Sequence, residues 1–392
     1  MNAQPIGGPI LTKGYRVILA LSLTAFAIVF WRLIAGLGPT TDLSDGYPWG
    51  IWIAFDVVTG TALACGGYAT AILCYVLNKG KYHPLVRPAI LTSALGYTIA
   101  GLSVFIDVGR YWLLYGVFMP WQWNLNSVLL EVALCITAYI FVLWIEFSPV
   151  FLEKLVTSKT GPRGIAAMKV SKFIDRSLVY ILALGLLLPT MHQSSLGSLM
   201  LVAGSKLHPY WHTAWLPLLF LVSCMAMGYS IVAFESLLGS ISFKRPAETS
   251  MLRSLAKVTL SLQVLYLILR YYELISSGKL QDFQFDRFGV MLCIETLLFL
   301  APLAVLVPPR KASNARLFIG AALMLLAGGL YRFDTYLIAF DPGAGWSYFP
   351  SIHETLVTLG FVATEVAIYV ALVKRFPVLT GAVLPGEAAS GA

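Results

Sequence analysis

Stretches of about twenty mainly apolar residues recur along the whole chain, separated by short polar segments. A helix needs roughly 20 such residues to cross a bilayer, and only helices or closed barrels satisfy their backbone hydrogen bonds there. No stretch alternates with the period of two residues that barrel strands require. The pattern predicts an all-α polytopic membrane protein. We expect one integral membrane domain over residues 1–392, with ten spans at residues 17–37, 51–77, 87–107, 125–147, 174–194, 211–238, 255–275, 288–307, 317–337 and 352–376.

Charged residues are scarce and make up 12% of the 392 residues, which is about half their share in soluble domains. This scarcity excludes an ordinary cytosolic enzyme or a nucleic-acid-binding protein. The excess of 27 basic over 19 acidic residues has another explanation, because the basic residues gather in alternate short loops, as the positive-inside rule requires. We therefore expect the chain to be surrounded by membrane lipid and to bind no nucleic acid.

The distribution of basic residues also predicts an orientation. With the N-terminus in the cytoplasm, 20 of the 27 Lys and Arg residues fall on the cytoplasmic side. Both termini are then cytoplasmic, since the number of spans is even. The first apolar run is too long for a cleavable signal peptide, so we expect it to be the first span. Seven basic residues are assigned to the outer side: Arg32, Arg110, Lys206, Arg270, Lys279, Arg287 and Arg332.

Cysteine and histidine positions argue against a metal centre. The five cysteines are scattered through apolar runs without a Cys-x-x-Cys pair, so neither an iron–sulfur cluster nor any other metal site is expected. A membrane b-haem needs two axial ligands on helices, and we place only His192 on a helix, since His212 and His353 stand at the very starts of the spans 211–238 and 352–376. We therefore expect no haem, although a single haem between His192 and His212 or His353 remains an alternative.

Ionisable side chains inside the second and third spans mark candidate functional positions, because each is costly in the bilayer. Asp56 lies beside small residues that allow close helix packing. Asp107 and Arg110 are spaced to pair at i, i+3 on one helical face, and Tyr97 lies deeper in the same span. The structural alternatives are a packed helix pair around Asp56, a rim pair for Asp107, and a hydrogen-bonded core tyrosine.

The fourth and fifth spans each present polar groups near their outer ends. Asn124, Ser127 and Glu131 are expected on one face, as the start of a hydrated path. Pro189 should kink the fifth span just below His192, so that His192 is presented in a polar pocket at the membrane surface. Imidazole can exchange a proton near neutral pH. Helix-to-helix hydrogen bonding and a structural interfacial histidine are the respective alternatives.

Further carboxylates occur in the later spans. Glu235 lies near the inner end of the sixth span and Glu295 within the eighth, while Glu354 and Glu365 share one face of the tenth. Acids distributed across the membrane suit proton conduction. Glu235 could instead belong to the polar interface.

Six sequence segments together resemble the NrfD/PsrC-like family of integral membrane subunits, especially its HybB-type members, which serve periplasm-facing nickel–iron (NiFe) hydrogenases. The resemblance covers nearly the whole chain. The segments are YPWGIWIAFD at 47–56, ACGG at 64–67, YHPLVRPA at 82–89, IDVGRYW at 106–112, NSVLLE at 126–131 and LPTMHQSS at 188–195.

The resemblance implies a fold, cofactors and partners. It implies two four-helix bundles with flanking spans in the bacterial inner membrane, and no haem or iron–sulfur cluster in this chain. An iron–sulfur ferredoxin-like subunit on the periplasmic face, together with the small and large hydrogenase subunits, would supply electrons to quinone, either menaquinone or ubiquinone.

It also implies residue roles. Asp107, Arg110 and His192 would form the quinone site, with Tyr111, Trp112 and Gln193 contacting the quinone. The proton path would comprise Tyr97, Glu131 and Glu235.

The predicted function is the quinone-reactive membrane subunit of a respiratory NiFe hydrogenase, coupled to proton movement and without catalytic activity toward hydrogen itself. A proton-coupled secondary transporter is an alternative, because ten spans, proline-broken helices and membrane acids also fit one. The membrane subunit of another NrfD-type oxidoreductase is a second alternative. A passive anchor is a third, although an anchor needs no buried acids.

Overall fold

A computed structural model describes residues 3–158, 162–281 and 283–379. Ten of its helices are long and apolar enough to cross a membrane, and the described residues contain no β-strand beyond one isolated bridge between Leu207 and Phe340. The predicted all-α polytopic fold is confirmed. Two of the ten spans include segments of π-helix, at residues 52–59, 72–76 and 334–338.

The helices run in the following order. They are α1 (Lys13–Ala35); a second span built from η1 (Trp52–Thr59), α2 (Gly60–Leu63), α3 (Gly66–Ala71) and η2 (Ile72–Val76); η3 (Gly80–Tyr82) and α4 (His83–Asp107); η4 (Tyr111–Phe118) and η5 (Pro120–Gln122); α5 (Val128–Phe147) and α6 (Pro149–Ser158); α7 (Pro162–Val202) and η6 (Gly204–Lys206); α8 (Leu216–Ser242); α9 (Thr249–Ser276); α10 (Arg287–Leu306) and η7 (Pro309–Lys311); α11 (Asn314–Phe333) and η8 (Asp334–Ile338); and α12 (Ile352–Arg375).

Side-chain caps fix where several of these helices begin. Thr12 accepts a hydrogen bond from the backbone of Tyr15, Ser313 accepts one from Arg316, and Ser351 forms a reciprocal capping box with Glu354. These caps satisfy N–H groups that the first helical turn leaves free. For this reason α1 and α11 begin a few residues before the apolar runs from which we located the spans.

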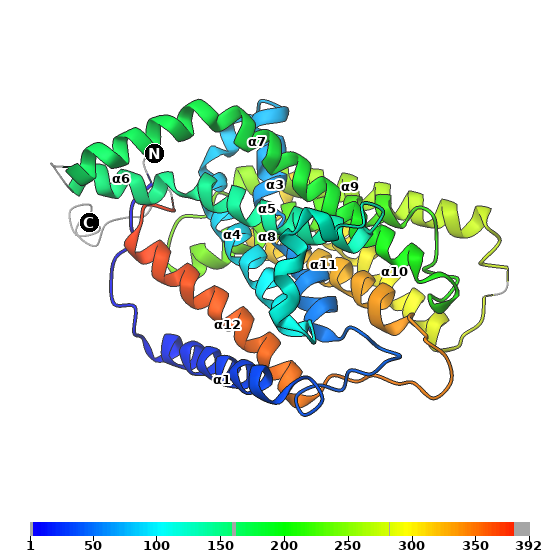
Figure 1. Ribbon diagram of the computed structural model, residues 1–392. Helices are drawn as coiled ribbons and strands as arrows, with labels where there is room; N and C mark the ends of the chain where they lie inside the picture. Colours follow the sequence, from blue (N-terminus) through cyan, green and yellow to red (C-terminus); the bar gives the residue numbers. More distant parts are fainter. Residues whose placement is uncertain (1–2, 159–161, 282, 380–392) are drawn as a thin grey trace.

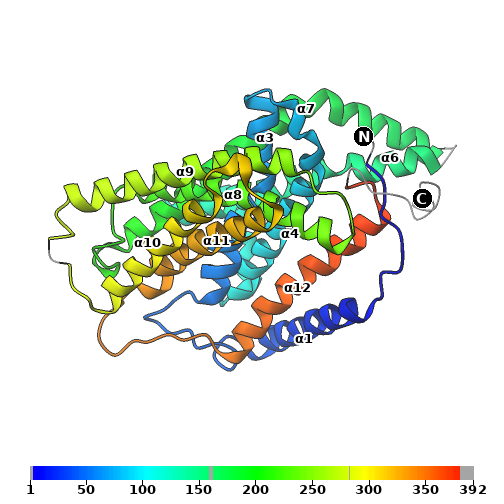
Figure 2. The ribbon, with the colours of Figure 1, turned by 180° about the vertical axis from the view of Figure 1, so that it is seen from behind.

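The spans pack as two bundles and one flanking pair (Figure 1). The second span, α4, α5 and α7 form the first bundle, and α8, α9, α10 and α11 form the second. Helices α1 and α12 lie side by side and pack on the first bundle through α4 (Figure 2). This arrangement agrees with the predicted pair of four-helix bundles and flanking spans.

Small residues let the two bundles approach closely. The second span is interrupted at Ala64 and Cys65, and Gly228 of α8 lies against this break. A Cβ atom at Gly228 would lie 2.8 Å from the carbonyl oxygen of Cys65 and 3.0 Å from the Cβ of Ala69. Close backbone approach at glycine is a common way for membrane helices to associate.

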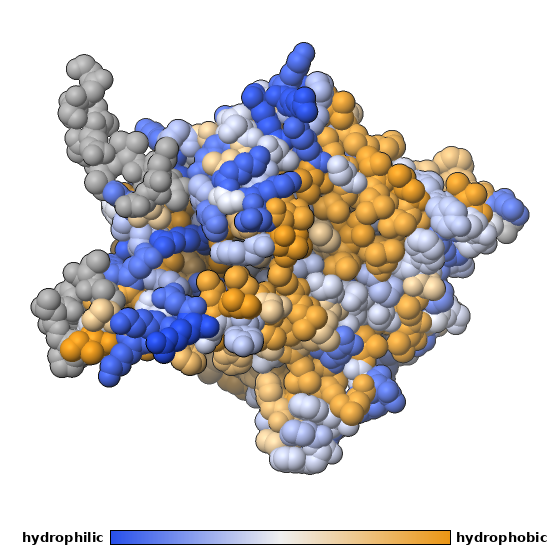
Figure 3. Space-filling model, turned by 90° about the horizontal axis from the view of Figure 1, so that it is seen from above, coloured by the Kyte–Doolittle hydropathy of each residue, from blue (hydrophilic) through white to orange (hydrophobic). Residues whose placement is uncertain are grey.

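The molecule has two distinct ends. Both described termini lie at the end that also carries α6 (Figure 1), which we call the terminal end. The opposite end, which we call the loop end, carries the segments 36–51, 108–127, 203–215, 277–286 and 339–351. Figure 3 shows a broad hydrophobic area across the middle of one face, with the most hydrophilic residues mainly toward the terminal end.

Three of the arginines that we assigned to the outer side are buried inside the protein. Arg32, Arg270 and Arg332 are at most 1% exposed. Each donates hydrogen bonds to buried backbone carbonyls, for example Arg32 to Val108 and Arg270 to Tyr210, both at 2.7 Å. The number of Lys and Arg residues in each segment could not show whether an arginine lies in a solvated loop or is hydrogen-bonded to backbone carbonyls inside a bundle.

Candidate functional site

His192 lies at the centre of an enclosed hydrogen-bond network. Its Nε2 atom is 2.8 Å from the hydroxyl oxygen of Tyr97, and its Nδ1 atom is 2.8 Å from the carbonyl oxygen of Leu188. The Tyr97 hydroxyl is 3.3 Å from the sulfur of Cys65. Because the Leu188 carbonyl can only accept, we assign the proton of neutral His192 to Nδ1, which leaves Nε2 to accept from Tyr97.

Gln193 and Arg332 extend this network toward the second bundle. The Gln193 amide nitrogen donates to Thr61 at 2.9 Å and lies 3.1 Å from Nε2 of His192. Its oxygen accepts from Arg332 at 3.3 Å. Arg332 also donates to the carbonyl of Val58 at 3.1 Å, so a residue of α11 is bonded to both the second span and α7.

The expectation that His192 and Gln193 lie in a pocket at the membrane surface is wrong. Helix α7 continues through Pro189 as far as Val202, and both side chains are 0% exposed. Hydroxyl groups along this polar run, such as Ser194, donate to carbonyls one turn earlier in the same helix. The run therefore remains helical, as serines and threonines often do when they bond back to their own helix.

Glu131 lies on the first turn of α5, toward the loop end. Its Oε1 atom accepts a hydrogen bond of 2.8 Å from Ser195, which follows His192 by one turn on α7. The expected polar face with Asn124 and Ser127 does not form. Ser127 instead caps α5, and Asn124 lies exposed before the helix, because the helix begins three residues later than its apolar run.

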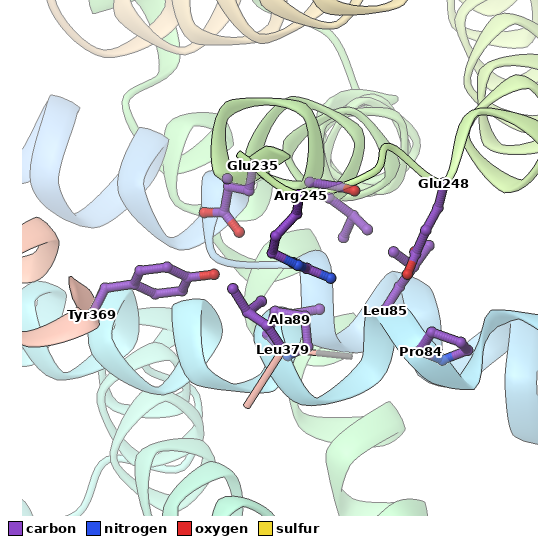
Figure 4. A pocket seen from close by; sticks show the side chains of 12 residues that line it. Pro84, Leu85, Ala89, Glu235, Arg245, Glu248, Tyr369 and Leu379 are labelled. Carbon is purple, nitrogen blue, oxygen red and sulfur yellow. The ribbon is translucent and has the colours of Figure 1, made fainter. Parts of the chain in front are cut away.

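Glu235 lies near the terminal end of α8 and accepts a hydrogen bond of 2.8 Å from Thr92 of α4. It borders a small pocket of about 30 Å³ at the terminal end. Figure 4 shows Glu235, Arg245 and Tyr369 pointing toward this pocket from α8, the segment after it and α12. Glu235 therefore lies beside polar groups of the terminal end.

Glu235 also lines a second, larger cavity of about 430 Å³ between the second span, α4, α8 and α12. Most of its lining is apolar, but Asp56 and Glu365 face it as well. Asp56 is 4% exposed and accepts hydrogen bonds from Ser103 at 3.1 Å and Thr358 at 3.2 Å. The cavity brings together three carboxyl groups that sequence analysis had identified on three different spans.

Asp107 belongs to a separate group near the loop end. It interacts electrostatically with Arg32 and Glu354, and Arg32 lies over the ring of Tyr111, 5.4 Å from its centre. The expected pairing of Asp107 with Arg110 is not among the ion pairs of the described residues. Helix α4 ends at Asp107, so Arg110 does not continue its face.

The aromatic residues of this region and Arg110 lie toward the surface. Arg110 is exposed, and Trp112 is 60% exposed and packs edge-on against Tyr111. The hydroxyl of Tyr111 donates to the carbonyl of Leu33 at 3.0 Å. The predicted quinone-site residues therefore divide into an enclosed part, with His192 and Gln193, and an accessible part, with Arg110, Tyr111 and Trp112.

Glu354 links several segments of the loop end through hydrogen bonds. Its carboxylate accepts hydrogen bonds from the backbone of Asp42 at 3.0 Å and from the hydroxyl of Tyr348 at 2.7 Å. The backbone of Ile51 donates to the same hydroxyl at 2.8 Å. Burial, with the nearby carboxylate of Glu354, raises the pKa of Tyr348 above its ordinary value. Tyr348 therefore remains a neutral donor that fixes two long loops to α12.

The arrangement places a hydrogen-bonded pair, Tyr97 and His192, in the interior, with carboxyl groups toward both ends. Among the described residues no hydrogen bond links Thr92 or Glu235 to Tyr97, so the predicted path has a gap on this side. Sequence reasoning assigned no role to Thr92, Cys65 or Arg332. Arg332 could have been found, because it lies inside the predicted span 317–337, where a cation needs a buried partner.

The fold and this interior define a polytopic helical membrane protein with buried polar and ionisable groups. Residues 39–339 match the family model "Polysulphide reductase, NrfD", and the chain belongs to this NrfD family. It is 44% identical over 384 residues, 96% of this chain and 95% of that protein, to the "Probable Ni/Fe-hydrogenase 2 b-type cytochrome subunit" of Escherichia coli.

Two further relatives come from Nitratidesulfovibrio vulgaris. The first, whose name states no activity, is 32% identical over 390 residues, covering 95% of this chain and 94% of that protein. The second is the "Menaquinone reductase, integral membrane subunit", which is 27% identical over 405 residues, covering 93% of this chain and 92% of that protein. Both matches extend over nearly the full length of the chain.

The expectation of a chain without haem is contradicted by the name of the E. coli relative, which is that of a b-type cytochrome subunit. Axial ligation needs an accessible histidine nitrogen. In this structure both ring nitrogens of His192 are engaged in hydrogen bonds, His208 stacks on Phe288, and His353 packs on Trp31.

Proposed function

We propose that this chain is the quinone-reactive membrane subunit of a respiratory NiFe hydrogenase. Electrons from hydrogen oxidation would reach quinone through an iron–sulfur subunit, and each quinone would take up two electrons and two protons to become a quinol. The name of the E. coli relative supports the hydrogenase, and that of the menaquinone reductase relative supports menaquinone.

The observation that carries the proposal is a pair of polar contacts one turn apart on α7, Ser195 with Glu131 and His192 with Tyr97. Glu131 contacts Ser195, and His192 contacts Tyr97, each at 2.8 Å. A positioned acid–base pair can transfer a proton in either direction. Tyr97 and His192 are buried and form no ion pair among the described residues, so they are better suited to transferring a proton than to holding a charge.

In this proposal the quinone head group lies near the loop end, beside Asp107, Arg110, Tyr111 and Trp112. Arg110 would interact with charge that develops on the quinone oxygens, and the aromatic rings would pack against the quinone ring. His192 and Gln193 would act from inside the protein, as the source of protons, and would not contact the quinone.

Protons would enter from the terminal end at Glu235. The pocket of about 30 Å³ and the cavity of about 430 Å³ both border this residue and support entry there. If the terminal end is cytoplasmic and the hydrogenase and iron–sulfur subunits dock at the periplasmic loop end, quinone reduction would consume cytoplasmic protons while hydrogen oxidation releases protons outside. The inner membrane would then gain a potential.

The test compares a purified hydrogenase complex that contains this chain with the same complex lacking it. We expect only the first to reduce a soluble menaquinone or ubiquinone analogue with hydrogen, because the second has no quinone site. Both should reduce viologen dye, which accepts electrons from the iron–sulfur centres directly. Equal quinone reduction by the two complexes would assign the quinone site to another subunit and refute the proposal.

A further inference from the structure

One face of α4 carries small and polar residues from the terminal end toward the loop end. The residues of this face, spaced by four, seven and four positions, are Thr92, Gly96, Ser103 and Asp107. Thr92 donates a hydrogen bond to Glu235 at 2.8 Å, and Ser103 donates one to Asp56 at 3.1 Å. This face of α4 therefore holds two of the three carboxyl groups that line the cavity of about 430 Å³.

Glu365 of α12 is the third carboxyl group of this cavity. A Cβ atom at Gly96 would lie 3.5 Å from its Oε1 atom, so the carboxyl group lies beside α4, one helical turn beyond Thr92. Among the described residues, no hydrogen bond or ion pair involves Glu365. A carboxyl group inside a membrane protein is costly unless it has a partner, and here water in the cavity can be that partner.

The cavity has an apolar outer side, whereas its carboxyl groups all lie beside α4. Leu238, Val362 and Val366 line it and are 44%, 41% and 41% exposed, so they face the lipid. One water molecule needs roughly 10–15 Å³ of such a volume, so the cavity has room for several along α4. No Lys, Arg or His is among the described residues that line it; Arg245 faces the small pocket on the terminal side of Glu235. No cation of the cavity wall therefore holds these carboxyl groups ionised.

We propose that this cavity forms a water-filled proton route from Glu235 through Glu365 to Asp56. The inference rests on the proposed function, because Asp56 is bonded to Ser103, one helical turn before Asp107, where the quinone is proposed to bind. Each carboxyl group takes a proton from the previous group through water and passes one on. The series therefore returns to its starting state after every transfer.

This route bypasses the gap between Glu235 and Tyr97. Neither Tyr97 nor His192 lines the cavity, so the two series of groups deliver protons separately. Reduction of one quinone consumes two electrons from the iron–sulfur subunit and two protons, and each series supplies one of the protons. Blocking either series should therefore slow the formation of quinol.

Variants of Glu365 in the purified hydrogenase complex test the route. Glu365→Gln removes the group that carries the proton and keeps its shape, whereas Glu365→Asp retains a carboxyl group. The control is Glu146→Gln on α5. Glu146 packs against α7, where a Cβ atom at Gly185 would lie 2.8 Å from its Oε1 atom, and it does not line the cavity. The rates of hydrogen-driven quinone reduction and of viologen reduction are measured in ordinary and in heavy water, together with the Tm.

We expect kcat for quinone reduction to fall roughly 100-fold in Glu365→Gln, with an unchanged KM, because Glu365 does not contact the quinone head group. The remaining rate should be more sensitive to heavy water, while viologen reduction and the Tm stay unchanged. Glu365→Asp should recover most of the rate, and Glu146→Gln should have the unmodified rate. Asp56→Asn, which can still accept a hydrogen bond from Ser103, should show the same loss as Glu365→Gln.

An unmodified kcat in Glu365→Gln, an equal loss in Glu146→Gln, or a loss that Glu365→Asp does not restore would overturn the route. If Glu365→Gln does not fold, Asp56→Asn decides alone: a lower kcat with an unchanged KM supports the route, and an unchanged kcat refutes it. Failure of the unmodified complex to reduce quinone would instead refute the proposed function.

Discussion

The two bundles bury polar groups of different kinds. The first bundle holds a network of formally neutral groups, Tyr97, His192, Gln193 and Cys65, joined by hydrogen bonds. The second holds an ion pair, Arg270 with Glu295, and a buried carboxyl group, Asp334, that receives no hydrogen bond from a described donor. A neutral acid–base pair can pass a proton without leaving an unpaired charge in a dry interior, whereas a buried ion pair keeps two charges in place. We therefore expect proton exchange in the first bundle and a structural role for the charges of the second.

Arg332 joins the two bundles through several buried hydrogen bonds, so its removal should have the largest effect. Arg332→Met removes at least three buried hydrogen bonds, those to the carbonyls of Val58 and Phe220 and to the amide oxygen of Gln193. At about 1 kcal/mol or more each, the loss should be roughly 3 kcal/mol. We expect little folded protein after purification. The exposed Arg176→Met on α7 serves as control, and a normal yield and Tm for Arg332→Met would contradict this role.

Close packing between the bundles is tested next, by two glycines of α8. A Cβ atom at Gly228 would lie 2.8 Å from a backbone carbonyl of the second span, whereas one at Gly239 meets nothing within 4 Å. Gly228→Ala should destabilise the protein by about 1–3 kcal/mol and lower its Tm, because the backbones must separate. Gly239→Ala should leave the Tm unchanged or raise it slightly. Equal Tm values would mean that the bundles tolerate separation here.

Within the first bundle, variants of two serines of α7 distinguish an effect on proton transfer from an effect on helix structure. Ser195 donates to Glu131, whereas Ser198 bonds only within α7. Ser195→Ala should slow hydrogen-driven quinone reduction about tenfold, which corresponds to 1.4 kcal/mol, because Glu131 loses its contact with α7. Ser198→Ala should have the unmodified rate. If both variants are equally active, Glu131 acts without Ser195.

The smallest effect is expected at the loop end of the second bundle. His208 stacks on Phe288 with ring centres 4.1 Å apart, and burial lowers its pKa. The folded protein therefore binds this proton less readily than the unfolded chain. The stability that neutral His208 contributes is complete above its ordinary pKa of about 6.5 and is lost as the pH falls below it.

The variant His208→Phe keeps an aromatic ring and removes the titrating group. Its Tm should decrease less than that of the unmodified protein when the pH is lowered from 7 to about 5, a range around the ordinary histidine pKa. Thermal unfolding in detergent at a series of pH values measures the difference. Parallel pH profiles would show that His208 titrates alike in the folded and unfolded protein.

The fold was more predictable from the sequence than the site. The length of the apolar runs and the alternation of basic residues between loops each depend on many residues, so together they predict the ten spans reliably. The environment of one side chain depends on where a helix ends and which neighbour faces it. The kink expected at Pro189 placed His192 at the membrane surface, but the helices packed around α7 bury it. The burial of Arg332 was not predicted, because the carbonyls that accept its hydrogen bonds, such as that of Val58, lie far away in sequence.

The account depends on proton exchange between Tyr97 and His192, and Tyr97→Phe tests it most directly. Phenylalanine keeps the ring that packs against Tyr139, 4.6 Å between centres, and loses only the hydroxyl that is 2.8 Å from His192. The measurement is the rate of hydrogen-driven quinone reduction divided by the rate of viologen reduction in the purified complex. We predict that this ratio falls roughly 100-fold, as for loss of a positioned acid–base group. An unchanged ratio would contradict the account and return Tyr97 to a packing role.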